Sequence, residues 1–310
     1  MDIMIVVNQM IQLFIMIGIG FVIAKTSLFE GDFNQKLTKL VLNMTMPCMI
    51  IASVMSSQNV TIALKDIMIS TFLLVLVLPA FAYLCIRFLP LKKHKGLYMF
   101  MIMYPNVGFM GFPLMQSIFG SESILSTAII NMGFNLSLFT LGIIVMNYGQ
   151  TDCPQLQLKS LLSPGVISSL MAILIYILKI SVPQVIVNPL TLIGNMTTPL
   201  AMMIIGATLA TYNIKDIFSD VKVYLFTIFI DVIVPIIFYP LIILFINDVM
   251  IQGITLIILA MPVANGAVLF AKTYGQDEFL AAKTVFISTL MAIITIPLLV
   301  YFFLNRVDKK

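Results

Sequence analysis

The stretch YPNVGFMGFP, from Tyr104 to Pro113, places two prolines, two glycines and an asparagine in an apolar run long enough to cross a membrane. Pro105 and Pro113 have no N–H, so each leaves the carbonyl four residues earlier without its helical partner. Gly108 and Gly111 lie between them and permit irregular backbone. Unpaired backbone groups are costly in lipid, so we expect this break to face protein or a water-filled cavity.

The whole chain is as apolar as this stretch. Of its 310 residues, 61% are hydrophobic and only 10% are charged, and the mean hydropathy is +1.10. This composition predicts an integral membrane protein. A helix needs about 20 apolar residues to cross the hydrocarbon layer, and strict alternation typical of a barrel is absent from the apolar runs, so they favour a polytopic all-α bundle. The ten expected segments are 4–24, 37–57, 67–88, 97–119, 124–147, 164–182, 187–211, 222–246, 252–274 and 279–303.

The basic residues predict the orientation. The first segment lacks the basic start and the cleavage site of a secretory signal, so we expect a retained helix whose N-terminus lies outside. Twelve lysines and arginines then fall inside and five outside, which predicts N- and C-termini outside the cell (cytoplasmic) membrane. The net charge of +4 reflects this topology and gives no reason to expect nucleic acid. Three scattered cysteines predict neither a disulfide framework nor a metal site, and no cofactor is expected.

A repeat is visible in the order of the landmarks. NMTMP at Asn43–Pro47 recurs as NMTTP at Asn195–Pro199, identical at four of five positions. The other matched landmarks, Pro79 with Pro235, Pro105 with Pro262, and the FGSE and YGQD turns, follow in the same order at offsets of 156, 157 and 155 residues.

This period contains five segments, an odd number, so the second copy enters the membrane from the opposite side as an inverted repeat. We therefore predict a first five-helix repeat at 1–148, a cytoplasmic linker at 149–163 and an inverted second repeat at 164–310. Inverted halves can exchange outward-open and inward-open states around one central site.

The second break matches the first. Pro262 interrupts the ninth segment, and Asn265 and Gly266 follow it, as Asn106 follows Pro105 in the fourth. Each carboxamide can donate to a carboxylate without burying a fixed charge. Half-helix ends add dipoles that attract an anion. The predicted substrate site therefore consists of the two asparagines and the irregular backbone at Pro105, Gly108, Gly111, Pro262 and Gly266. Two simpler interpretations remain open, a plain proline kink and asparagines that only cap the broken helices.

Four further polar residues are weaker candidates. Asn43 and Asn195 could line a cavity or only join helices. Asp231 is the only acidic residue deep within a segment, so it could take up a proton or sodium for coupling, be paired with Lys222, or extend its carboxylate toward the membrane surface. Lys272 could attract anions or anchor the inner membrane surface.

The two broken segments also carry a family resemblance. PNVGFMGFPL (Pro105–Leu114) followed by FG, and AMPVANGAVLFAKTYG (Ala260–Gly275), resemble the signatures of the auxin efflux carrier family, which includes microbial malate and malonate permeases. The resemblance implies a scaffold domain from segments 1, 2, 6 and 7, often dimer-forming, and a transport domain from segments 3–5 and 8–10. It implies that broken segments 4 and 9 cross, that Asn106 matches a carboxylate-binding asparagine, and that the transport domain moves like an elevator.

The sequence departs from the plant members of this family at two places. The linker after the fifth segment, Gly149–Ser163, is short, as in the microbial branch and unlike many plant carriers. The third segment lacks the mid-membrane acidic residue associated with the plant proteins, and Asp231 lies in the eighth instead, so the coupling stays open.

These patterns predict a secondary active transporter of small organic anions, such as malate, by alternating access. The expected partners are a carboxylate substrate, the lipid bilayer and a second copy of the chain. The alternative is a membrane channel or a transporter-like receptor sensing an organic acid. An intramembrane enzyme is not expected, because Asp231 has no second deep carboxylate and the only histidine, His94, lies in a loop.

Overall fold

Helices account for nearly all the secondary structure in the computed structural model, which describes residues 3–26, 32–56, 63–88, 93–148, 164–211, 218 and 220–307. Over these residues the single non-helical pairing is one isolated β-bridge, between Pro105 and Val263. The predicted linker at 149–163 lies outside the described residues.

The helical elements follow the apolar runs of the sequence. In chain order they are α1 (Ile3–Ile23), α2 (Phe33–Leu40), η2 (Val41–Thr45), α3 (Met46–Ser56), α4 (Leu64–Phe72), η3 (Leu73–Val77), α5 (Leu78–Phe88), α6 (Lys95–Met103), η4 (Val107–Gly111), α7 (Phe112–Phe119), α8 (Glu122–Ser137), η5 (Leu138–Gly142), α9 (Ile143–Met146), α10 (Pro164–Leu178), α11 (Gln184–Asn195), α12 (Thr197–Leu209), α14 (Val221–Ile228), η7 (Phe229–Ile233), α15 (Val234–Phe245), α16 (Val249–Leu259), α17 (Gly266–Thr273) and α18 (Glu278–Val307). Elements labelled η are π-helical turns.

Five helical runs are long and apolar enough to cross a membrane. They are Phe33–Met55, Leu64–Phe88, Gln184–Leu209, Val221–Phe245 and Glu278–Phe302, and a sixth is counted if the bent pair at 122–146 forms one span. The chain is therefore an all-helical, multi-pass membrane protein. The predicted fourth and ninth segments are not among the five, because each is interrupted at its proline. Ten crossings of the membrane remain a prediction.

The prolines shape several helices without ending them. In η3 the N–H of Leu78 bonds five residues back, and Pro79 follows; in η7 the N–H of Val234 does the same, and Pro235 follows. A proline N atom cannot donate, so widening the preceding turn into a π-helix relieves the clash and keeps the run continuous.

The described residues cluster into two compact units. The first comprises Met1–Ala63, Gly108–Met132 and Leu162–Asn213, and the second comprises Leu64–Val107, Gly133–Leu161 and Ile214–Lys310.

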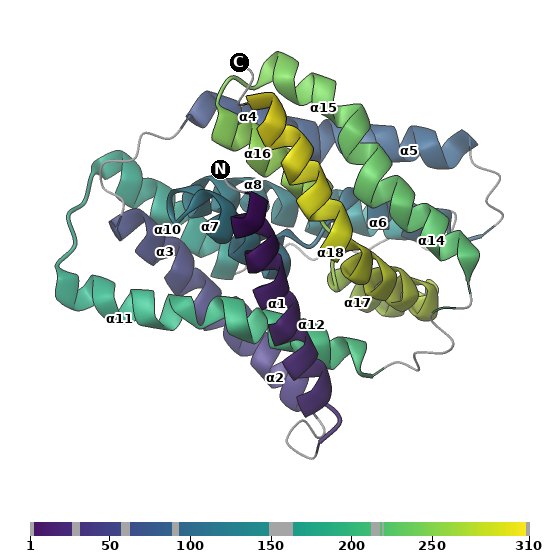
Figure 1. The fold of residues 1–310 in the computed structure, drawn as a ribbon, viewed down its shortest axis with the longest axis horizontal. Helices are drawn as coiled ribbons and strands as arrows, with labels where there is room; N and C mark the ends of the chain where they lie inside the picture. The colour runs from purple at the N-terminus through teal and green to yellow at the C-terminus, as the bar shows by residue number, and fades with distance from the viewer. Residues whose placement is uncertain are drawn as a thin grey trace. The chain divides into compact units, whose positions relative to one another are not determined.

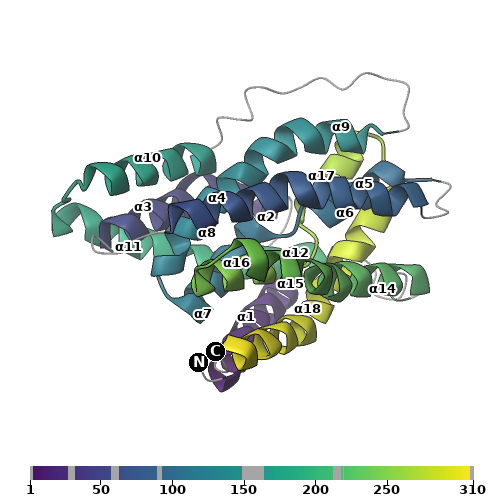
Figure 2. The ribbon, with the colours of Figure 1, turned by 90° about the horizontal axis from the view of Figure 1, so that it is seen from above.

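Small residues let the helices of the first unit approach closely. In Figure 1, α1 crosses α12, and the two helices pack together. A methyl group on Gly20 would overlap the backbone of Met203, and one on Gly206 would overlap the backbone of Ile17. Elsewhere in this unit α3 packs against both α10 and α11, and these three helices lie together in Figure 2. Small residues at helix contacts are typical of membrane proteins, where close backbone packing replaces the hydrophobic effect.

Polar ties join α4 to α16 in the second unit. The carboxylate of Asp66 is buried and its Oδ2 accepts the backbone N–H groups of Asn247 at 3.2 Å and Asp248 at 2.7 Å. One turn along, the hydroxyls of Ser70 and Thr255 lie 2.7 Å apart. Asp66 thus satisfies amides at the start of α16 that have no intrahelical acceptor. These hydrogen bonds fix the position of α16 along the continuous helical run formed by α4, η3 and α5. Figure 2 shows α16 beside this run.

Candidate functional site

Two helix breaks meet in the second unit. Helix α6 ends at Met103 and helix resumes at Val107, while α16 ends at Leu259 and α17 begins at Gly266. Between these ends the two chains run antiparallel and form the bridge between Pro105 and Val263. The N–H of Asn106 donates to Pro262 O at 2.8 Å. The N–H of Ala264 donates to Tyr104 O at 3.1 Å. We call residues 104–106 and 262–264 the crossing.

Side chains from neighbouring helices fix both strands of the crossing. The hydroxyl of Tyr104 lies 2.9 Å from both the carbonyl oxygen and the Oγ of Ser137, and its ring packs 4.7 Å, centroid to centroid, from that of Phe100. On the other strand, the N–H of Val263 donates to Ser288 Oγ on α18 at 3.1 Å. Tyr104, Val263 and Ser288 are all buried. The crossing is therefore held on both sides by buried hydrogen bonds.

The hydrogen bonds of the crossing occupy backbone N–H groups at the two helix breaks. Prolines were expected to leave backbone groups available around the crossing. Instead, the N–H groups of Asn106, Val263 and Ala264 are used within the protein. Buried amides are costly when unpaired, and this pairing satisfies them. These three N–H groups are therefore not available to a ligand in this structure.

Of the two predicted asparagines, Asn106 lies within the crossing and Asn265 directly follows it. Asn106 is 2% exposed and its backbone forms part of the crossing. Asn265 precedes α17 at the N-cap position, but its side chain makes no capping hydrogen bond. Its Oδ1 is buried and has no hydrogen-bond partner among the described residues. The simple capping role considered for Asn265 is thus not the one that the structure displays. A methyl group placed on Gly266 would meet no atom within 4 Å, so there is open space at the start of α17.

The other predicted site residues lie in different places. Pro105 and Pro262 belong to the crossing, whereas Gly108 and Gly111 fall in the first unit. Lys272 is exposed in the last turn of α17.

The two asparagines of the NMTMP and NMTTP motifs differ from each other. Asn43 is exposed on η2. Asn195, at the end of α11, lines a pocket of about 70 Å³ in the first unit. The polar side chains of this pocket come from α3, α7, the turn before α8 and α11, namely Ser53, Gln116, Ser121, Thr191 and Asn195.

Asp231 lies in η7 and is fully buried. Neither of its carboxylate oxygens has a hydrogen-bond partner among the described residues. Lys222, considered as its partner from the sequence, is exposed, and the one ion pair found in the described part of the chain joins His94 to Asp277. The predicted alternative of a structural Asp231–Lys222 pair is therefore wrong.

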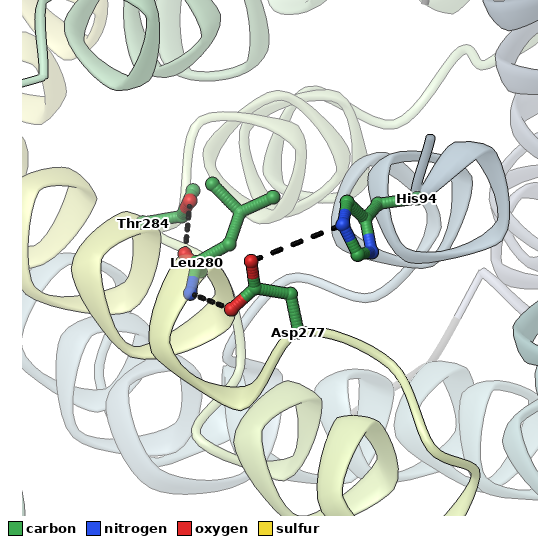
Figure 3. A network of polar contacts seen from close by, with 4 residues as sticks. All are labelled: His94, Asp277, Leu280 and Thr284. Carbon is green, nitrogen blue, oxygen red and sulfur yellow. Dashed lines mark hydrogen bonds and ion pairs between the residues drawn. The ribbon is translucent and has the colours of Figure 1, made fainter. Parts of the chain in front are cut away.

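That ion pair links two helix starts in the second unit. His94 Nε2 lies 3.9 Å from Asp277 Oδ2, and Asp277 Oδ1 accepts the N–H of Leu280 at 2.9 Å (Figure 3). Asp277 thereby caps α18, and His94 precedes α6 in a left-handed conformation with φ of 58°. Both side chains are about one-third or more exposed, so we assign this pair a structural role.

Several residues that hold the site gave no signal in the sequence. Ser137, Ser288 and Asp66 are isolated polar residues in or beside apolar runs, and nothing in their spacing marks their partners. Tyr104 is the exception, because a hydroxyl directly before Pro105 in a membrane segment indicates a buried acceptor nearby.

The fold is that of a multi-pass helical membrane protein. Comparison with known proteins agrees, since residues 5–300 match the family described as "Membrane transport protein". The chain belongs to this family. It is also similar to an uncharacterized transporter, MJ1031, of Methanocaldococcus jannaschii, with 23% identity over 311 positions that cover 97% of this chain and 100% of that protein. Transport rather than catalysis is thus the activity indicated by both matches. The microbial malate or malonate branch remains a prediction.

Proposed function

We propose that the protein is a secondary active transporter of small organic anions, such as malate and related carboxylates, that works by alternating access. The observation that carries this proposal is the crossing, where two interrupted helices meet as antiparallel strands in the second unit. Secondary transporters place substrates at such discontinuous helices, because half-helix ends and irregular backbone there can face a cavity.

The proposed inverted repeat has support from two sources. The π-helical turns Leu73–Val77 and Phe229–Ile233 lie 156 residues apart, the same offset that separates Pro79 from Pro235. In the first unit, α1 packs on α12 and α10 packs on α3. In terms of the proposed repeats, the first helix of each repeat packs on the second segment of the other, as a two-fold relation requires.

The domain division is also part of the proposal. The first unit contains α1, α2, α3, α10, α11 and α12, which are the proposed scaffold helices. Residues Gly108–Met132, from the proposed fourth and fifth segments, cluster with that unit as well. We propose that segments 3–5 and 8–10 form the transport domain and that this domain moves by an elevator mechanism. We also propose that two copies of the chain dimerise through the scaffold helices. The protein would lie in the cell membrane with both termini outside.

We assign anion recognition to the carboxamides of Asn106 and Asn265 together with the start of α17. Because the backbone N–H groups of the crossing are used within the protein, we assign carboxylate binding to the two carboxamides and to the N-terminal end of α17, which carries partial positive charge. Gly266 leaves open space at that end. Because the carboxamides are neutral, the site without substrate does not have to bury an unpaired cation, which would be energetically costly. Lys272, exposed at the other end of α17, is proposed to draw anions toward the site.

Counterflow tests this proposal. Purified protein in vesicles preloaded with malate should accumulate labelled malate, whereas a channel would only equilibrate it and a receptor would bind without moving it. Asn106→Ala and Asn265→Ala each remove a hydrogen bond to a charged group, about 1.5–3 kcal/mol, so binding should weaken about 10- to 150-fold. Asn147→Ala is the matched control, since Asn147 follows α9 and its carboxamide donates to Ile143 O of that helix at 2.8 Å. Unchanged affinity in both site variants would remove the proposed site.

A further inference from the structure

Two buried polar side chains, four residues apart on one helical run, have oxygens for which the described part of the chain supplies no hydrogen-bond partner. Asp231 in η7 and Thr227 in α14 are both 0% exposed. Both carboxylate oxygens of Asp231 and the Oγ1 of Thr227 lack a hydrogen-bond partner among the described residues. Buried polar groups are almost always satisfied in native proteins, so three unpartnered oxygens at one place call for a ligand.

The local backbone brings these oxygens together and adds another. Residues four apart lie on the same helix face, about 5–6 Å between Cβ atoms, so Thr227 and Asp231 can bind one small ion from adjacent turns. Pro235 has no N–H and therefore removes the α-helical hydrogen bond to the carbonyl of Asp231 itself. All of these groups are acceptors or, in the case of the threonine hydroxyl, able to act as one.

The chemistry of this cluster selects a small monovalent cation. An ionised carboxylate buried without a partner is strongly unfavourable, and within the described residues no Lys or Arg pairs with it. Carboxylate, hydroxyl and backbone carbonyl oxygens are ligands of hard cations. The single negative charge matches one positive charge. We propose that Asp231, Thr227 and the carbonyl freed by Pro235 form a sodium-binding site.

The number of oxygens favours sodium over a proton. A proton needs one carboxylate oxygen and one acceptor, and it would leave the remaining oxygens as they are. A sodium ion can be coordinated by all of them at once, as unwound backbone and side chains do at other transporter sites. The first repeat lacks the site, because its matching π-helical turn has Val75 where the second has Asp231.

The site is also connected to the crossing within the second unit. Helix α18 packs against η7 and α14, and its Ser288 accepts the N–H of Val263 in the crossing. Sodium bound at Asp231 would therefore affect how α18 packs against η7 and α14, and α18 is the helix that holds one strand of the crossing. Resting on the proposed function, this makes sodium the coupling ion for anion transport.

Sodium binding can be measured without any substrate. The thermal midpoint of the purified full-length protein is followed as sodium chloride replaces choline chloride at constant ionic strength and pH. A ligand of the native state stabilises it in proportion to RT ln(1 + [L]/Kd), so the midpoint should rise with sodium and saturate. Potassium chloride in place of sodium chloride at the same pH should give a smaller rise.

Variants assign the effect to this cluster. Asp231→Asn should abolish the rise, because the neutral carboxamide no longer attracts a cation. Thr227→Val should raise the half-saturating sodium concentration about tenfold, the loss of one ligand oxygen, and Thr227→Ser should restore it. Thr127→Val is the matched control, a buried threonine of the first unit whose hydroxyl donates to Ser123 O at 2.8 Å.

Two outcomes would overturn the proposal. One is a midpoint that does not respond to sodium, whether or not it responds to pH; a response to pH alone would assign the carboxylate to a proton. The other is a sodium response that persists in Thr227→Val with unchanged half-saturation, which is informative even if Asp231→Asn does not fold. Because no anion is present, a negative result here leaves the counterflow test of the proposed function unaffected.

Discussion

Replacing Ser288 by alanine tests whether the crossing is held by α18. Ser288 and Val263 are buried, and the 3.1 Å bond from the Val263 N–H to Ser288 Oγ is the anchor of that strand to α18. The variant removes the acceptor and leaves a buried N–H unsatisfied, which costs about 1–3 kcal/mol. The free energy of unfolding should fall by this amount.

Ser126→Ala supplies the matched control. Ser126 is also 0% exposed, but its Oγ has no hydrogen-bond partner in the described part of the chain. Deleting that hydroxyl removes an unsatisfied group, so the variant should be neutral or more stable. Both variants can be compared by equilibrium unfolding in mixed detergent micelles, with malate binding measured in parallel.

Both substitutions delete a buried serine hydroxyl, but only the one at Ser288 loses hydrogen bonds, one from the Val263 N–H and one to Val285 O in its own helix. We therefore expect Ser288→Ala to be less stable than Ser126→Ala by at least about 1 kcal/mol and to bind the anion more weakly, because one strand of the crossing loses its anchor. Equal unfolding free energies, or a Ser288→Ala protein with full stability and unchanged binding, would refute the argument that α18 holds the crossing.

Three further predictions concern packing and capping. Gly20→Ala should destabilise the first unit by about 1–3 kcal/mol, because its methyl group overlaps the backbone of α12, whereas Gly18→Ala meets no atom within 4 Å and should be neutral; thermal unfolding of the pair decides this. Asp66→Ala should lower the free energy of unfolding by about 1.5–3 kcal/mol, because the amides at the start of α16 lose a charged acceptor. Faster hydrogen exchange of those amides would be specific for this loss. Asp277→Ala should lower the free energy of unfolding by about 1 kcal/mol, because α18 loses its cap. His94→Ala should lower it by less than about 0.5 kcal/mol, because the ion pair is partly exposed. Equal losses in the two variants would show that the ion pair contributes more than the cap.

Hydropathy and proline positions predicted the helical layout because both act locally. Helix covers each apolar segment placed from the sequence, and it is interrupted at Pro105 and Pro262. An apolar run in lipid must satisfy its own backbone, which makes helix the obligatory choice wherever prolines allow it. The helical class and the two breaks therefore followed from composition and from the chemistry of one residue type.

Contacts between distant segments could not be read in the same way. The sequence marked Asn106 and Asn265, but it contains no sign that the crossing amides pair with each other and with Ser288. It marked Asp231 and offered Lys222 as a partner, whereas in the structure Asp231 is buried with no partner among the described residues and Lys222 is exposed. A pairing of this kind depends on which helix faces meet, and similar apolar faces do not encode that choice locally.

The sequence by itself determined that this chain is a helical membrane protein with two interrupted segments of related pattern, since apolar length, proline and asparagine carry that information residue by residue. Only the tertiary structure decided which polar groups at the breaks are already satisfied and which are left over. Hydrogen bonds across the crossing use the backbone N–H groups of Asn106 and Ala264, whereas the side-chain oxygens of Asp231 and Thr227 have no hydrogen-bond partner among the residues that the structure describes.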